Sequence, residues 1–409
     1  MTVLDWSGLL AGVESLFAAS SPGGESMCIG AELELIPFDM ETRRSVPIGT
    51  TAEKASLPLL RTIAAHAGWM EVPADPDPPS WSLPGGERVS YEPGGQIELS
   101  SAISATASGL IRDIQCIVQL MTATFEREGI SLEAVGVDPY NDIDDVALQL
   151  HRPRYERMSR YFDSIGPSGA RMMRQTASLQ INVETGRNPH QRWGFLNSLS
   201  PYLTAIFANS PVYAGQANGQ RNIRAHVWRT LDTTRTGLPV DMDDPAGAYL
   251  GFALGAGAMM YGGGSPYPSF ADWMRTGVPT MEDWELHLST LFPEVRPRHY
   301  FELRSADAIP PQYLAAPIAF VTGLTYDQTA NLRASAILGA ADSARLETAG
   351  RVGLRDAAMQ ETSDELVEIA LAGCESLGTE YLSEADLESA ADFFDRYTRQ
   401  GRSPGDDWG

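Results

Sequence analysis

Four stretches of the chain alternate apolar and polar residues with a period of two, which is the pattern of a β-strand that buries one face. These stretches occupy residues 28–38, 94–100, 175–184 and 298–304. In the first stretch, Leu33 and Leu35 share one face of the strand, while Glu32 and Glu34 share the other. We therefore expect the four strands to lie in one antiparallel sheet that has an apolar face and a polar face.

Much of the remaining chain has the period of amphipathic helices. The predicted helices cover residues 1–20, 51–69, 104–129, 153–163, 191–208 and most of the chain from 313 onward. The proline-rich stretch 71–88 is predicted to be a loop, the glycine-rich stretch 251–268 to break into one, and residues 401–409 to be disordered. No linker separates two compositions, so the pattern favours an α+β protein with one large unit and a helical C-terminal region.

Composition narrows the possible functions. The 409 residues include 30 Lys and Arg against 53 Asp and Glu, for a net charge of −23, which argues against a nucleic-acid-binding protein. Lys54 is the only lysine, and this excludes a P-loop. The widely spaced Cys28, Cys116 and Cys374 indicate a reducing cytoplasm, and we find neither a signal peptide nor a membrane-spanning stretch.

The polar strand faces carry an unusual number of acids for β-structure, where Asp and Glu are depleted. Their residues are Glu32 and Glu34; Gln96, Glu98 and Ser100; Ser178, Gln180, Asn182 and Glu184; and Tyr300, Glu302 and Arg304. One interpretation is a plain solvated face. The other is a convergent site, in which carboxylates 4 Å apart would repel by ~4 kcal/mol at an effective dielectric constant near 20 unless a cation lay between them. Oxygen ligands without His or Cys suit Mg²⁺ or Mn²⁺, often together with the phosphates of a nucleotide.

Two arginine-rich stretches, 151–161 and 221–237, are candidates for binding phosphate or carboxylate groups. Surface ion pairing is the simpler interpretation for most of their arginines. Arg304 differs because it shares a strand face with Glu302. We find neither a GxSxG nucleophile elbow, which would indicate a covalent nucleophile, nor an HExxH motif, which would indicate a zinc site.

Six segments occur in an order that resembles a known enzyme family. They are GAELE (30–34), SYEPGGQIELS (90–100), RQTASLQIN (174–182), FANSPV (207–212), RAHVWRTLDTTRTG (224–237) and HLSTLFPEVRPRHYFELRSAD (287–307). This series resembles the glutamate–cysteine ligases of the plant and proteobacterial type, and it is similar to the actinobacterial γ-glutamylcysteine ligases of ergothioneine synthesis. The resemblance runs from about residue 28 to about residue 315.

The resemblance implies a glutamine-synthetase-like fold, with a curved antiparallel sheet and helices on its convex side. It implies an N-terminal helix at 1–24, a catalytic domain at 25–315, a helical region at 316–400 packed on that domain, and a tail at 401–409. The implied reaction joins the γ-carboxylate of L-glutamate to the amine of L-cysteine through a γ-glutamyl phosphate, with ATP as co-substrate and Mg²⁺, or alternatively Mn²⁺, as the metal. We expect a cytoplasmic monomer or homodimer without nucleic-acid or membrane partners.

The resemblance also implies roles for individual residues. The implied metal ligands are Glu32, Glu34, Glu92, Glu98 and Glu302. The residues expected at the nucleotide are Gln180, Asn182 and Arg304. The residues expected at the substrates are Arg235, which would hold the glutamate α-carboxylate, with Arg224, Gln96, Met173 and Tyr155. The residues expected to act in catalysis are Arg304, Glu302 and Arg235, and Glu302→Gln is expected to nearly abolish turnover while leaving the fold intact.

Two departures from the family's pattern bear on the amine acceptor. They are Arg-Gln-Thr at 174–176 and Ala-Asp-Ala-Ile-Pro at 306–310. Two alternatives therefore stay open: a ligase that couples glutamate to another amine, and a non-catalytic scaffold of the same fold.

Overall fold

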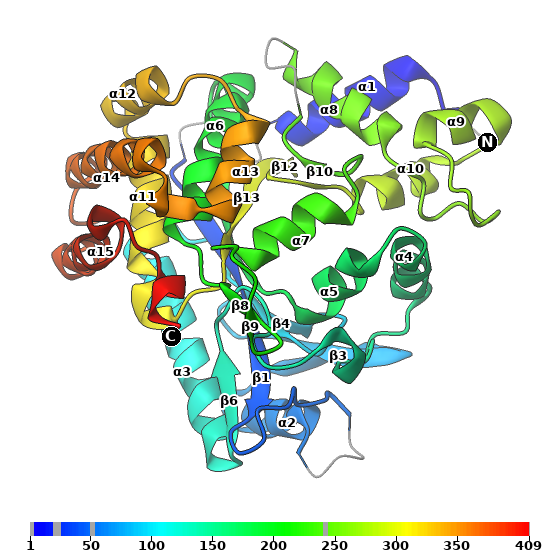
Figure 1. The fold of residues 1–409 in the computed structure, drawn as a ribbon, viewed down its shortest axis with the longest axis horizontal. Coiled ribbons are helices and arrows are strands. Elements are labelled where there is room, and N and C mark those ends of the chain that lie inside the picture. Colours follow the sequence, from blue (N-terminus) through cyan, green and yellow to red (C-terminus); the bar gives the residue numbers. More distant parts are fainter. Residues whose placement is uncertain (1–3, 19–25, 50–53, 240–243, 409) are drawn as a thin grey trace.

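One large antiparallel sheet organises the molecule (Figure 1). The structure is a computed structural model that describes residues 4–18, 26–49, 54–239 and 244–408. The nine strands of the sheet follow the order β12-β13-β7-β1-β5-β4-β3-β2, and β6 pairs with the far end of β1. They are β1 (Ile29–Asp39), β2 (Met70–Ala74), β3 (Asp77–Ser82), β4 (Arg88–Tyr91), β5 (Ile97–Ser100), β6 (Ile130–Glu133), β7 (Ser178–Glu184), β12 (Val295–Pro297) and β13 (Tyr300–Asp307). Two short ribbons pair β8 (Val212–Tyr213) with β9 (Gln216–Ala217) and β10 (Thr236–Gly237) with β11 (Phe292–Pro293).

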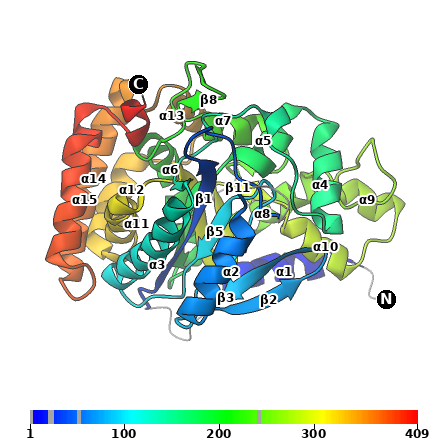
Figure 2. The same ribbon diagram turned by 90° about the horizontal axis from the view of Figure 1, so that it is seen from below.

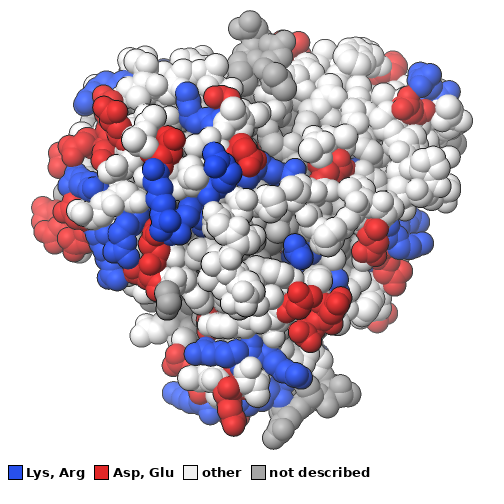
Figure 3. Space-filling view, viewed as in Figure 1, with Lys and Arg blue, Asp and Glu red and all other residues white. Residues whose placement is uncertain are grey.

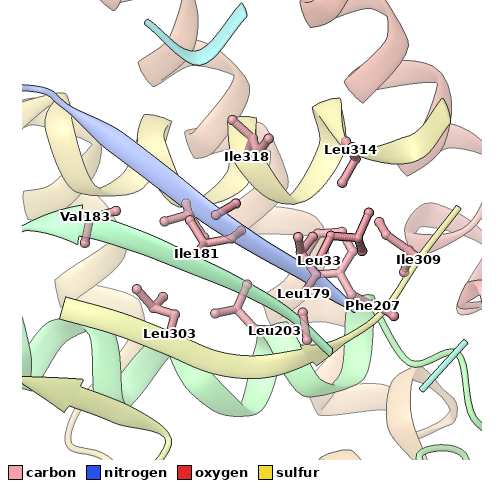
Figure 4. Close-up of a cluster of buried hydrophobic side chains, with 14 of the residues drawn as sticks. Leu33, Leu179, Ile181, Val183, Leu203, Phe207, Leu303, Ile309, Leu314 and Ile318 are labelled. Carbon is pink, nitrogen blue, oxygen red and sulfur yellow. The ribbon is translucent and has the colours of Figure 1, made fainter. Parts of the chain in front are cut away.

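The apolar face of the sheet is covered by α3 (Ala107–Arg127), α6 (Pro189–Ile206) and α11 (Ala315–Tyr326). Figure 4 shows Leu33 and Ile181 of the sheet between Ile318 of α11 and Leu203 of α6. Leu33 and Ile181 are at most 1% exposed, as their alternation with polar residues predicts. The expected α+β class, with helices packed on the face of the sheet away from the carboxylates, is therefore confirmed.

Two further groups of helices lie on either side of this core. Figure 2 shows α12 (Gln328–Leu338), α14 (Ala357–Leu377) and α15 (Glu384–Arg396) stacked beside α11 at one side of the molecule. The polar face of the sheet is covered by α4 (Pro153–Asp163), α5 (Pro167–Gln175) and α7 (Ile223–Leu231), which supply most of an apolar cluster separate from the main core. The remaining helices are α1 (Trp6–Phe17), α2 (Ser56–Ala67), α8 (Pro245–Gly255), α9 (Phe270–Thr276), α10 (Met281–Leu288) and α13 (Ser343–Arg351). None of the described helices is long and apolar enough to cross a bilayer.

The predicted loop at 71–88 was wrong, because β2 and β3 occupy most of it. Pro78 and Pro79 lie in β3 at an irregularity in its pairing with β2, between the pairs Val72–Ser80 and Ala74–Asp77. β4 pairs only with the end of β3 at Trp81 and Ser82, so the prolines leave no ladder hydrogen bond unmade on that side.

The predicted disorder of the segment 401–409 was wrong for residues 401–408. Pro404–Asp407 forms a 3₁₀ turn with a capping box from Ser403, and Ser403, Pro404 and Gly405 are buried. A short polar sequence without helical periodicity gives no local sign of this order, because its partners lie elsewhere in the chain.

Acidic and basic side chains are interspersed on the face shown in Figure 3, with wide uncharged areas between them. Many of the arginines pair with acids in the described structure, including Arg399 with Glu368 and Asp395. Despite the net charge of −23, the acidic side chains on this face do not form one continuous acidic surface.

Candidate active site

Strand register brings the predicted acids together on the polar face of the sheet. Glu34 of β1 lies directly opposite Glu98 of β5. Glu32, two residues earlier on the same face, lies opposite Gln180 of β7. Like charges directly opposite one another destabilise an antiparallel pair, so this arrangement is costly without a compensating cation.

These side chains line a cavity of about 320 Å³ between the sheet and helices α4, α5 and α7. Ten predicted site residues line it: Glu32, Glu34, Glu92, Gln96, Glu98, Tyr155, Met173, Gln180, Arg224 and Arg304. The acids come from β1, β5 and the β4–β5 turn, whereas Arg296, Arg298 and Arg304 come from the β12–β13 hairpin. The cavity thus has an acidic floor beside a wall of guanidinium groups.

Glu92 enters the cavity from the β4–β5 turn, where periodicity could not place it. Gln96 holds this turn, because its Oε1 accepts from the Gly94 amide at 2.9 Å and its Nε2 donates to the Thr176 carbonyl at 2.8 Å. Gly94 is required there, since a Cβ atom would lie 2.0 Å from the carbonyl oxygen of Arg174. Gln96 therefore lines the cavity, but its amide is committed to holding the turn that carries Glu92.

Burial raises the pKa of each acid on the floor above its ordinary value, and the neighbouring acids add to the effect. The pKa of Glu32 rises to about 8, through burial and then through the charges of Glu98 and Glu302. Burial and Glu34 raise the pKa of Glu98, although Ser90 and Ser100 each donate a hydrogen bond to its Oε1 at 3.2 Å. The floor carries more negative charge than its own donors can stabilise.

The donor chemistry of this floor fits a hard divalent cation. Carboxylate oxygens without His or Cys are the ligands that Mg²⁺ and Mn²⁺ prefer. Burial and mutual repulsion raise the pKa values of these acids, and nearby arginines offset the effect only in part. In the described ranges, however, no group of three or more acidic, histidine or cysteine side chains is already arranged to chelate an ion. Metal binding therefore requires these side chains to adjust around the ion.

Glu302 differs from the acids of the floor because arginines already surround it. Arg296 forms two hydrogen bonds to its carboxylate at 2.5 and 2.9 Å, and guanidinium nitrogens of Arg304 and Arg298 lie 3.4 and 3.7 Å from Oε1. Burial alone would raise the pKa of Glu302, but these arginines overcome it and hold the pKa at about 2. This arrangement argues against the implied role as a metal ligand and for a role as the buried counter-ion of the arginine wall.

Arg304 is the member of that wall that contacts Gln180, on the polar face of the sheet. Its Nη1 donates to Gln180 Oε1 at 2.5 Å, and its guanidinium lies over the rings of Trp228 and Phe292 at 5.4 and 5.9 Å. Burial lowers the pKa of Arg304, but no carboxylate other than Glu302 forms an ion pair with it in the described structure. Its remaining donors can bind an anion in the cavity.

A sequence model of the glutamate-cysteine ligase family 2 (GCS2) matches residues 28–407. The chain belongs to this family. The match includes the C-terminal helices, and so extends well beyond the 28–315 over which the resemblance was recognised. The three cysteines are unpaired in this member of the family.

Named relatives agree with this assignment. The chain is 33% identical over 345 residues to glutamate–cysteine ligase EgtA of Mycolicibacterium smegmatis, covering 80% of this chain and 78% of the relative. It is 32% identical over 321 residues to the chloroplastic glutamate–cysteine ligase B of Oryza sativa subsp. japonica, covering 74% of this chain and 63% of the relative. Among solved structures, the glutamate–cysteine ligase of Francisella tularensis in complex with AMP has a TM-score of 0.53 at 10% identity, covering 93% of this chain and 84% of that chain, and so shares the fold.

The structure places Arg235 away from the cavity of this glutamate–cysteine ligase family member. Its fully buried guanidinium pairs with Asp232 at 2.7 Å and donates to the carbonyls of Thr290 and Gly257. It also lies over the ring of Tyr161 at 4.8 Å. The guanidinium of Arg235 is thus occupied by partners within the protein. This arrangement does not support the prediction that Arg235 holds the glutamate α-carboxylate.

Asn182 lies in a second cavity of about 190 Å³, which shares Glu32 and Ser100 with the first. Its Oδ1 is buried and has no hydrogen-bond partner in the described structure. Gly30, opposite Asn182 in the strand register, leaves this second cavity open beside the first strand.

Sequence reasoning did not single out Arg154, which lines the first cavity from α4. Its Nη2 donates to the Ser289 carbonyl at 3.0 Å, but its Nε is buried without a partner, and it forms no ion pair among the described residues. Arg296, Arg298, Arg304 and Arg224 of the same cavity all have acidic partners. The stretch 151–161 was recognised as arginine-rich, but only tertiary contacts separate this arginine from its neighbours on the surface.

Proposed function

We propose that this protein joins the γ-carboxylate of L-glutamate to the amine of L-cysteine at the expense of ATP, giving γ-glutamylcysteine, ADP and phosphate. Family membership supports this reaction. The observation that carries it is one cavity with an acidic floor and a guanidinium wall. The acidic floor suits the metal ions that accompany a polyphosphate, and the guanidinium wall suits anionic substrates.

On this proposal, Mg²⁺ would be held by Glu32, Glu34, Glu92 and Glu98. The metal would supply positive charge that neutralises the transferring phosphoryl group. The second cavity, beside Asn182, would take the rest of the nucleotide, since it opens onto the same acidic floor through Glu32.

The arginines orient the anions. Arg304 points its free donors at the γ-phosphate, while Gln180 and the rings of Trp228 and Phe292 hold its guanidinium in place. Arg154 and Arg224 bind the substrate carboxylates. The unpaired Arg154 binds the glutamate α-carboxylate, the role that the family resemblance implied for Arg235. Guanidinium groups held in place by their partners stabilise developing charge without reorganising.

The chemistry proceeds in two displacements. A γ-carboxylate oxygen of glutamate attacks the γ-phosphorus of ATP, ADP leaves, and the γ-carbonyl becomes an acyl phosphate. The cysteine nitrogen then attacks that carbonyl carbon, phosphate leaves with the electron pair of the broken C–O bond, and the nitrogen loses a proton. The protein's contribution is positioning and charge neutralisation, and no side-chain nucleophile is needed.

Phosphate release from Mg-ATP with L-glutamate and a panel of amines tests the proposal. We expect release that requires both glutamate and L-cysteine. Release with another amine but not with cysteine would identify the alternative ligase, and no release with any amine would identify the non-catalytic scaffold. Arg304→Lys should lower kcat by about 100-fold, because a lysine cannot reproduce the bidentate fork, while the surface variant Arg399→Lys serves as the matched control.

We propose a monomer or homodimer that acts in the cytoplasm, in keeping with its unpaired cysteines. Sedimentation velocity of the full chain would distinguish the two oligomeric states.

A further inference from the structure

Asp307 is a fully buried carboxylate that the proposed mechanism does not use. It ends β13, three residues after Arg304, and lies behind the cavity rather than in its lining. Burial raises the pKa of this carboxyl, whereas the charge of Arg224 lowers it. A buried acid is costly unless it is paired, so its contacts indicate what it does.

Its nearest cation is Arg224, a cavity residue. Arg224 Nη1 lies 3.6 Å from Asp307 Oδ1, and the two side chains are 4% and 0% exposed. Oδ1 has no hydrogen bond in the described structure, so its interaction is with the guanidinium charge. The other side of the guanidinium is tied through Nη2 to the Arg304 carbonyl at 2.7 Å.

The FANSPV segment at 207–212 holds Asp307 from behind. The Asn209 amide donates to Asp307 Oδ2 at 2.7 Å, and Ser210 Oγ donates to the same oxygen at 2.6 Å. The Arg224 amide in turn donates to Ser210 Oγ at 3.2 Å. This motif was recognised in the sequence, and it contributes no residue to the lining of the first cavity.

The segment 403–408 closes the back of this network. The Gly405 amide donates to the Ala208 carbonyl at 2.9 Å, and Trp408 Nε1 donates to Asn209 Oδ1 at 3.2 Å. Asp406 pairs with Arg221, just before α7, the helix that carries Arg224. A stretch predicted to be disordered is thus fastened to the loop that fixes the buried acid.

We propose that Asp307 is a positioning residue that sets the Arg224 guanidinium in the cavity, and that Trp408 fixes the supporting loop through Asn209. The effect on turnover rests on the proposed function, in which Arg224 binds a substrate anion. The placement of the guanidinium does not rest on it.

The test uses Asp307→Asn in the full chain, with Asp138→Asn as the control. Asp138 is an equally buried acid that accepts hydrogen bonds from Ser45 and Asn141 and does not line the cavity. We expect Asp307→Asn to raise the KM of one substrate about tenfold to a hundredfold with kcat changed less, because a desolvated charge pair loses one partner. Asp138→Asn should lower the melting temperature and leave every KM within about twofold.

A double-mutant cycle separates positioning from general destabilisation. In an Arg224→Lys background, Asp307→Asn should add less than about twofold to the affected KM, because the two changes act through one guanidinium. Additive effects, or an Asp307→Asn protein with wild-type KM values, would overturn the proposal. A crystal structure of Asp307→Asn supplies the readout that does not depend on turnover, and an unmoved Arg224 guanidinium would also overturn it.

Trp408→Phe keeps an aromatic ring but removes the Nε1 donor together with the pyrrole part of the indole. We expect it to raise the same KM by about two- to fivefold in the wild type and to have no effect in Asp307→Asn. Asp407→Asn, which breaks ion pairs with Arg396 and Arg402 in the same segment, is the control and should leave that KM unchanged. An unchanged KM in Trp408→Phe would remove Trp408 from the proposal. If the wild type forms no product, the proposed function fails, while the crystal structure still decides the role of Asp307.

Discussion

Removing one acid from the floor of the cavity should stabilise the metal-free fold while abolishing its activity. The perturbation is Glu98→Gln, which keeps the shape of the side chain and deletes its charge. Glu98 lies directly opposite Glu34, and Cβ atoms of such pairs are ~5 Å apart. Two charges at that separation repel by about 3 kcal/mol at an effective dielectric constant of 20.

The net gain is smaller because the floor is partly protonated. Burial and neighbouring charge raise the pKa of Glu32 to about 8, so the folded state already holds protons that the unfolded state has lost. We therefore expect Glu98→Gln to stabilise the metal-free protein at pH 8 by ~1–2 kcal/mol, which is about 1–2 °C in melting temperature for a chain of this length.

The stability of the metal-free protein should depend on pH, and the sign of this dependence follows from the pKa of Glu32. Between the ordinary glutamate pKa and about 8, the folded protein binds more protons than the unfolded chain, because the pKa of Glu32 is raised on folding. Stability without metal should therefore fall as pH rises through this window. Glu98→Gln removes one source of the raised pKa, so its stability should fall less steeply with pH.

Glu302→Gln is the matched comparison, since it makes the same substitution on the same sheet with the opposite environment. Glu302 neutralises Arg296, Arg298 and Arg304, and removing one partner of a buried ion pair costs ~3–5 kcal/mol, or about 4–6 °C here. This expected loss of stability differs from the sequence-based expectation that the substitution leaves the fold intact. Differential scanning calorimetry in EDTA from pH 5 to 9, with phosphate release measured in Mg²⁺, gives both readouts.

The reasoning would be refuted if Glu98→Gln lowered the melting temperature at pH 8 as Glu302→Gln does. It would also be refuted if Glu98→Gln kept wild-type turnover in Mg²⁺. The first result would show that the acids of the floor do not repel one another, and the second would show that Glu98 is not needed to bind the metal.

Three further outcomes follow from the geometry. Arg154→Ala should raise the KM for glutamate at least tenfold with little change in melting temperature, and an unchanged KM in steady-state kinetics would exclude its role as the carboxylate partner. Arg235→Lys should lower the melting temperature, because contacts with Asp232 and Thr290 are lost, while the KM for glutamate stays within about threefold. A selective rise in that KM would support the role of Arg235 in binding the glutamate α-carboxylate. Millimolar Mg²⁺ should raise the melting temperature of the wild type more than that of Glu98→Gln in thermal-shift measurements, because the ion relieves a repulsion that the variant lacks, and equal shifts would contradict this.

The sequence alone was sufficient to assign the strand faces. A period of two puts Glu32 and Glu34 on one face and Leu33 and Leu35 on the other, whatever the rest of the chain does. The apolar face then has to be buried, which predicts the α+β sheet with helices on one side. The six segments found in the family's order added the family, and with it the expected roles of ten of the residues that line the cavity.

The partners of the charged residues were decided only by tertiary structure. Arg154, Arg235 and Glu302 carry formal charges that the sequence displays equally well, but their roles depend on which partners reach them. The same holds for Glu92 in its turn and for the segment 403–408. An alternating pattern is a local property of the backbone, whereas the balance of charge around a buried group depends on contacts between segments far apart in the chain, as the charge of Glu302 acts on Glu32.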